Sequence, residues 1–166
     1  MPEPTAPSLP PPRRVVTGHN TNGQATVAFD SHLAPQSVGD GTNLTILWST
    51  SEHPANVSGP EDAAPSAPSW PPKGSGITAY DIPPKTEGVF HRSITLDYVI
   101  VGKGSVVLGL EDGSKVTLNE GDMVVQRATM HGWSNTTDQW ARLYGMMVPA
   151  QAPIVNGEEL KEDWPF

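Results

Sequence analysis

The sequence predicts an all-β sandwich or barrel, and two observations support this fold class. The 16 glycines and 18 prolines make up about a fifth of the 166 residues, which disfavours long helices and favours short strands with turns. Apolar and polar residues alternate in about ten or eleven short runs, with turn residues roughly every 6–10 positions. This spacing is typical of a sandwich or barrel rather than of βαβ units.

The runs can be placed individually, because each ends at a turn. The predicted strands are 13–20, 24–31, 43–50, 77–84, 96–104, 105–110, 114–119, 123–127, 131–135 and 140–149. Asp112-Gly113 lies between two apolar runs and indicates a hairpin. Gly104 and Gly121 are predicted turn residues with unusual backbone dihedrals.

Three segments lie outside this pattern. Residues 1–12 are Pro-rich and are expected to be a disordered or extended tail before a domain at 13–150. Residues 51–76 contain six prolines and predict a long irregular loop, in which Trp70 either pins the loop to the barrel or covers a pocket. The polar tail 151–166 is expected to form one helical turn around 158–162.

Composition excludes several classes of function. A formal net charge of −8 disfavours nucleic acid as a partner, because phosphate binding needs clustered Lys and Arg. No apolar run approaches the roughly 20 residues of a membrane span. There is no cysteine, so a metal would need nitrogen and oxygen ligands. The first residues contain no apolar signal region, so we expect an intracellular, cytoplasmic protein.

Two histidines and an aspartate mark the predicted site. Residues two apart in a strand share a face, so His91, Ser93 and Asp97 can all point inward, and a barrel can bring His131 opposite them. Two imidazoles and one carboxylate form the ligand set of facial-triad iron sites. His91, Asp97 and His131 are therefore predicted metal ligands for Fe, Mn, Ni or Zn, and a metal-free site remains the alternative. Each histidine could instead be a hydrogen-bonded core residue.

The stretch 88–135 resembles the cupins, which are small double-stranded β-helix (jelly-roll) barrels. His91 falls on the first His of their first motif, Asp97 on its Glu, and Gly104 on its closing Gly. In the second motif, Gly121 matches the opening Gly and His131 the His, one residue early. Asn135 keeps the spacing to the final Asn and is predicted to satisfy backbone groups in a turn.

This sequence departs from the cupin pattern at one ligand position. Ser93 stands where the second His of the first motif is expected, and could hydrogen-bond a metal-bound water or a substrate oxygen instead. The stretches HRSITLDYVIV and GDMVVQRATMHGWSN are also similar to small single-domain cupins of fungi and bacteria.

The resemblance implies a lyase, a decarboxylase or dehydratase, acting on an organic acid or a polyketide-like secondary metabolite. In this reading His91, Asp97 and His131 either hold a Lewis-acid metal or act directly as acid and base. The alternatives are an Fe(II)-dependent oxygenase, an isomerase, and a small-molecule-binding cupin without catalysis.

Further residues are candidates for substrate binding. An inward Arg127 could clamp a carboxylate, but alternation allows only one of Gln126 and Arg127 to face inward, and an outward Arg127 would be a surface or dimer charge. The other candidates, beside Ser93, are Trp133, Trp48 and Tyr144. Exposed strand edges and the resemblance predict a homodimer, with 13–18 or 25–29 as the exchanged strand.

Overall fold

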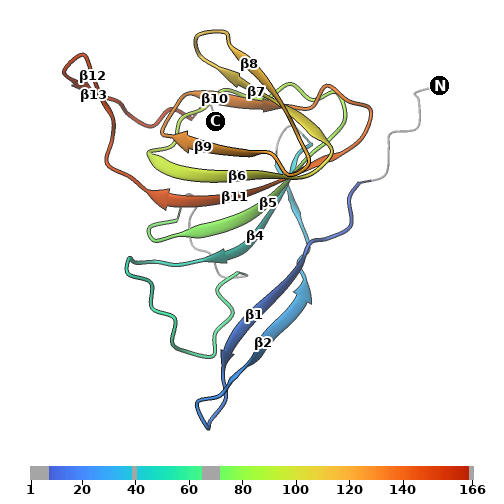
Figure 1. Cartoon of the computed structure of the whole chain (residues 1–166), viewed down its shortest axis with the longest axis vertical. Coiled ribbons are helices and arrows are strands. Elements are labelled where there is room, and N and C mark those ends of the chain that lie inside the picture. Colours follow the sequence, from blue (N-terminus) through green and yellow to red (C-terminus); the bar gives the residue numbers. More distant parts are fainter. Residues whose placement is uncertain (1–7, 39–40, 65–71, 165–166) are drawn as a thin grey trace.

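The computed structural model describes residues 8–38, 41–64 and 72–164, and its regular elements there are all strands. Most of them build a barrel from two sheets that face each other (Figure 1). The strands are β1 Arg13–His19, β2 Ala25–His32, β3 Gln36–Ser37, β4 Asn43–Ser49, β5 Gly76–Ile82, β6 Thr95–Lys103, β7 Ser105–Leu110, β8 Lys115–Asn119, β9 Met123–Arg127, β10 His131–Ser134, β11 Ala141–Pro149, β12 Ile154–Val155 and β13 Glu158–Glu159. This confirms the all-β prediction.

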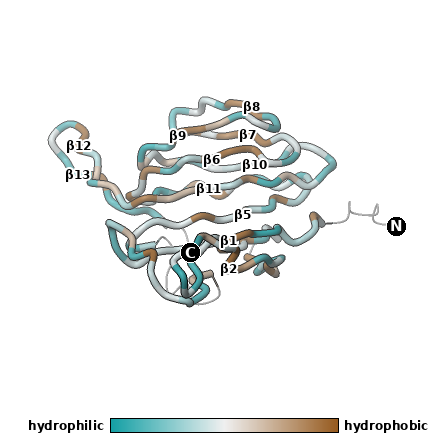
Figure 2. The backbone as a smooth tube through the Cα atoms, turned by 60° about the horizontal axis from the view of Figure 1, so that its bottom comes forward, coloured by the Kyte–Doolittle hydropathy of each residue, from teal (hydrophilic) through white to brown (hydrophobic). Residues whose placement is uncertain are grey.

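The larger sheet has the order β3-β4-β5-β11-β6-β9, and the smaller has the order β10-β7-β8. All of these neighbours are antiparallel. Figure 2 shows strands β6, β11 and β5 stacked one above another, in the order that they have in the larger sheet. Because sequence neighbours such as β5 and β6 are separated by β11, the fold brings distant segments side by side.

Strand β6 shows how alternation divides the barrel interior. Asp97, Val99 and Val101 are buried on its inner face, whereas Tyr98 is exposed on the other. Val101 packs in a cluster with Val106, Leu118 and neighbouring apolar side chains. Asp97 instead lines a cavity. The hydrophobic core and the cavity therefore lie at successive levels of the same barrel.

The β1–β2 hairpin projects from the barrel (Figure 1) and is held at its base by Arg14. The guanidinium of Arg14 donates to both carboxylate oxygens of Asp62, at 2.6 and 2.5 Å, and to the carbonyl of Leu47. Asp62 belongs to the irregular segment after β4, so Arg14 joins hairpin, sheet and loop. The described parts of the predicted loop, residues 51–64 and 72–75, contain no strand; Trp70 lies outside the described residues.

The two tails differ from their predictions. The helical turn expected around 158–162 is wrong: β12 and β13 form a short hairpin through Asn156 and Gly157. Both of these residues have positive φ, 53° and 85°, as a tight two-residue hairpin turn requires. At the other end, Pro12 is buried and the Pro10 carbonyl accepts a hydrogen bond from Arg142, so this part of the tail is docked. Residues 1–7 lie outside the described part of the chain.

Two smaller expectations are met. Gly104 and Gly121 have φ of 75° and 90°, as predicted for turn glycines. Asn135 is fully buried, and its side-chain amide donates to the carbonyls of Ile82 and Gln139 while its oxygen accepts from Thr137.

The described residues include no helix long and apolar enough to cross a membrane.

Candidate functional site

The barrel contains a cavity of about 780 Å³ between its two sheets. Apolar side chains make most of its wall, and one polar group of side chains interrupts it. The lining residues are Val38, Leu44, Thr78, Tyr80, Val89, His91, Ser93, Asp97, Val99, Gln126, His131, Trp133, Leu143, Gly145, Met147 and Trp164. A mostly apolar wall with a few convergent polar groups is the usual form of a small-molecule site.

His91 and His131 lie side by side in the cavity wall because the segment before β6 pairs with the start of β10. Their backbones exchange two hydrogen bonds, of 2.9 and 3.1 Å, and their ring centroids are 4.4 Å apart. The Nδ1 atom of His131 is 2.9 Å from the carbonyl of Thr129, and that of His91 is 3.1 Å from the carbonyl of Val89. A carbonyl can only accept, so each Nδ1 carries a proton, and a ring that is neutral then presents the lone pair of Nε2 to the cavity.

Burial favours the neutral form of His131, which is only 3% exposed. Burial lowers the pKa of His131 from 6.5 to about 4, helped by the neighbouring His91 and opposed by the bond to Thr129. At neutral pH its Nε2 is therefore a free base inside a mainly apolar cavity. This is the state required of a general base.

Asp97 is the carboxyl group of the site. It is 4% exposed, and burial raises its pKa. The amide of Gln126, which faces Asp97 across the β6–β9 ladder, donates to its Oδ2 at 2.8 Å. Asp97 Oδ1 and Gln126 Oε1 are both buried without a hydrogen-bond partner. A carboxyl with a raised pKa is suited to hold and deliver a proton.

Ser93 lines the same cavity, but its hydroxyl is already engaged. Its Oγ is 2.7 Å from the Oγ1 of Thr95, two residues further along the chain, and Ser93 is 2% exposed. Inward placement of His91, Ser93 and Asp97 agrees with the alternation on which the sequence prediction relied.

The donor set bears on the predicted metal centre. The two imidazoles are close, but in the ranges that the structure covers no group of three or more His, Cys, Asp or Glu side chains is arranged to hold a metal ion. At the position where cupins have the second His of the first motif, this chain has Ser93, whose hydroxyl is hydrogen-bonded to Thr95. These side chains therefore do not fit a complete protein-supplied metal site, and the metal ligand set stays a prediction.

The substrate-binding candidates separate into two groups. Trp133 lies in the cavity wall, with its ring edge-on to that of His131 at 6.1 Å. Arg127 is exposed, because Gln126 takes the inward position of β9, so the outward alternative holds and Arg127 does not line the cavity. Gln126, which was not among the predicted site residues, could have been found from this alternation.

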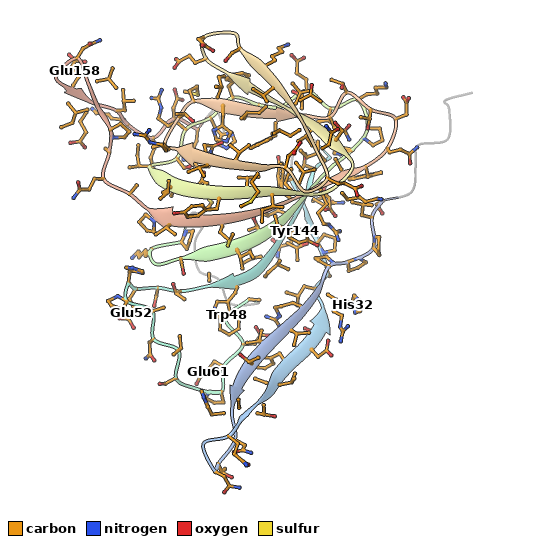
Figure 3. The ribbon with its side chains drawn as sticks, viewed as in Figure 1. His32, Trp48, Glu52, Glu61, Tyr144 and Glu158 are labelled. Carbon is orange, nitrogen blue, oxygen red and sulfur yellow. The ribbon has the colours of Figure 1, made fainter. Side chains whose placement is uncertain are left out.

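Trp48 and Tyr144 also lie outside the cavity. Trp48 follows a bulge in β4 and faces the β1–β2 hairpin (Figure 3), where the Arg14 guanidinium lies 5.9 Å from its ring. Tyr144 alternates with Leu143 and Gly145, which line the cavity, so its ring is on the opposite face of β11. Neither residue lines the cavity as predicted. For Tyr144 the reason is that neighbouring strand residues point to opposite faces, and for Trp48 it is the bulge, which pairs it with Ile77 rather than with a residue of the cavity wall.

The lowered pKa of His131 predicts a specific loss of stability in acid. Between about pH 6.5 and 4 the unfolded chain binds a proton at this residue that the folded chain does not, so stability falls as pH falls. We expect the difference in unfolding free energy between the wild type and His131→Asn to shrink by about 2–3 kcal/mol from pH 7.5 to 4.5. Urea unfolding at both pH values measures it.

Taking the difference between the wild type and His131→Asn cancels the contributions that other titrating groups make to the pH dependence of stability. The raised pKa of Asp97 acts with the opposite sign, because the folded chain holds that proton more tightly, but it is present in both proteins. A pH-independent difference would mean that His131 is not buried in its neutral form.

Individual proteins of known sequence are similar to this chain over most of its length. No family model matches the chain. The cupin-domain-containing oxidoreductase srdB of Neurospora crassa is 31% identical over 164 residues, which are 95% of this chain and 84% of that protein. Oryzines biosynthesis cluster protein J of Aspergillus oryzae is 29% identical over 166 residues, 93% of this chain and 92% of that protein. The cupin-domain-containing oxidoreductase virC of Hypocrea virens is 30% identical over 166 residues, which are 95% of this chain and 86% of that protein.

Solved structures agree on the fold. KdgF from Halomonas sp. superposes with a TM-score of 0.52 at 19% identity, over 70% of this chain and 86% of that one. The polyketide cyclase RemF from Streptomyces resistomycificus gives a TM-score of 0.53 at 15% identity, over 81% of this chain and 80% of that one. With srdB 31% identical over 95% of this chain and 84% of its own length, and with the jelly-roll barrel confirmed, this chain belongs to the cupin-domain family.

Proposed function

We propose that this protein is an enzyme of secondary metabolism that performs acid–base chemistry of the lyase type on a polyketide-like molecule. The observation that carries the proposal is the neutral imidazole of His131, whose free Nε2 lies in the same apolar cavity as the buried carboxyl of Asp97. Relatives whose names place them in biosynthesis clusters, such as the oryzines protein, support the metabolic setting.

The cavity wall favours a neutral substrate over a free acid. Among the described residues that line it there is no Lys or Arg, and its ionisable groups are the imidazoles of His91 and His131, the carboxyl of Asp97 and the phenol of Tyr80. A substrate carboxylate would lie near Asp97 without a cation to pair with it, which is costly in an apolar site. This favours dehydration over decarboxylation among the lyase reactions.

A dehydration can be written with these side chains alone. His131 Nε2 takes a proton from the carbon next to a substrate carbonyl, and the C–H electron pair forms a C=C bond. The C–O bond of the neighbouring hydroxyl breaks, and Asp97, whose neutral form is favoured by burial, supplies the proton with which the hydroxyl leaves as water. The proton on His131 then returns to Asp97 through solvent, which restores the site. Gln126 holds the carboxyl in place throughout.

Oxidation is the second candidate function, because the relatives srdB and virC are both named oxidoreductases. It requires an oxidant, such as dioxygen or a bound cofactor, whereas the dehydration requires none. The two reactions therefore change the substrate in different ways: dehydration removes water, and oxidation removes hydrogen or adds oxygen.

These mass changes provide the test. Purified protein is incubated with a panel of hydroxylated aromatic ketones, with and without dioxygen and with and without EDTA, and the products are analysed by mass spectrometry. We expect loss of water in all four conditions. A product formed only with dioxygen, or lost on treatment with EDTA, would favour the oxidoreductase instead.

We also propose that the protein forms a homodimer through the β1–β2 hairpin. The hairpin projects from the barrel and exposes Val15 and Val27, at 51% and 57%. A two-stranded hairpin is only marginally stable without a packing partner. We expect light scattering to give a dimer mass, and Val27→Asp to convert it to a monomer because a charge would replace buried apolar surface.

Val57→Asp is the matched control, since Val57 is 90% exposed on the loop after β4. It should leave the mass unchanged. A monomer mass for the wild type at every concentration would contradict the dimer.

A further inference from the structure

The C-terminal segment 160–164 returns to the barrel after the β12–β13 hairpin and ends over its interior. Arg92 and Asp163 exchange two backbone hydrogen bonds, of 2.8 and 2.9 Å, in an antiparallel bridge. Trp164 follows directly and is thereby fixed beside His91.

Trp164 contributes to the cavity wall. Its ring is nearly parallel to that of His91, with an interplanar angle of 18° and a centroid distance of 4.8 Å. It lines the cavity together with Trp133, whose ring is edge-on to that of His131. Each histidine of the site is therefore paired with one tryptophan, and the two imidazoles themselves are in contact.

We propose that Trp164 is a specificity-determining residue that stacks on a planar aromatic ring of the substrate. One face of its indole stacks on His91 and the residue lines the cavity, so the opposite face is the one that a substrate ring would contact. Aromatic pairs add about 0.5–1.5 kcal/mol beyond the area they bury, and a saturated ring of the same size gains none of this. The inference rests on the proposed function only in placing the substrate in this cavity.

Binding of two matched probes tests the stacking. The probes are 2-naphthol and its saturated analogue decahydro-2-naphthol, which have the same carbon skeleton and hydroxyl group, and calorimetry measures both affinities. We expect wild-type protein to prefer 2-naphthol by roughly threefold to tenfold. Trp164→Leu should remove most of this preference, and Trp164→Phe should retain it.

Trp48→Leu is the control, because Trp48 is a half-buried tryptophan outside the cavity and its loss should leave the preference intact. Equal affinity of the wild type for both probes, binding of neither, or an equal weakening of both by Trp164→Leu would overturn the proposal. The measurement needs no turnover, so its outcome is separate from the dehydration test: stacking can hold while the proposed reaction fails, and the reverse.

Discussion

Replacing Asp81 with Asn is expected to lower the free energy of unfolding by about 3–5 kcal/mol. Asp81 on β5 and Arg142 on β11 face each other across the ladder and form a bidentate pair, with two bonds of 2.6 Å. Their side chains are 4% and 10% exposed, and the Asp81 carboxylate raises the pKa of Arg142. Removing the carboxylate charge would leave a buried guanidinium without its counterion, which is far more costly than losing a surface pair. Urea unfolding measures the change.

The exposed Arg13–Asp30 pair provides a matched control. It has the same bidentate geometry, with two bonds of 2.8 Å, but its side chains are 60% and 45% exposed. Asp30→Asn should leave the unfolding midpoint nearly unchanged, because solvent screens such pairs. If the two variants lose similar stability, burial does not make the Asp81–Arg142 pair more stabilising than the exposed pair. Replacing both Asp81 and Arg142 with apolar residues should recover much of the loss.

Replacing His131 with Asn is expected to reduce turnover by about 10²- to 10⁴-fold, the contribution of a positioned general base. Asn can preserve a hydrogen bond to Thr129 but offers no basic nitrogen to the substrate. The rate of product formation in the mass-spectrometric assay measures the effect. Binding of 2-naphthol should change much less, since Trp133 and Trp164 remain in the cavity wall.

His32→Asn is the control for this substitution, because His32 is exposed at the end of β2, on the hairpin and away from the cavity (Figure 3). It should retain full activity. A His131→Asn protein that folds normally and keeps wild-type turnover would contradict the acid–base mechanism.

The sequence predicted most strands to within one or two residues, because alternation and turn residues are local properties. The run 105–110 is β7 as predicted, and 123–127 is β9. The same local rule placed Ser93 and Asp97 inward. The prediction of a helical turn in the tail was wrong, because Asn156-Gly157 forms the turn of the β12–β13 hairpin.

The substrate-binding residues were predicted less well, because apolar and aromatic character does not reveal which face of a strand is inner. Trp48 and Trp133 are equally good candidates by composition, yet only Trp133 lines the cavity. The β4 bulge between Ile46 and Trp48 alters the register there, and a bulge has no clear signature in this sequence.

The sequence by itself determined the all-β class, the positions of most strands along the chain, and the two histidines and the aspartate that share one interior. Tertiary structure alone decided what surrounds them: Gln126 against Asp97 across a ladder, and Trp164 against His91 from the far end of the chain. The physical reason is that alternation acts over two residues, whereas cavity walls are made by strand pairings between segments tens of positions apart, which no local pattern records.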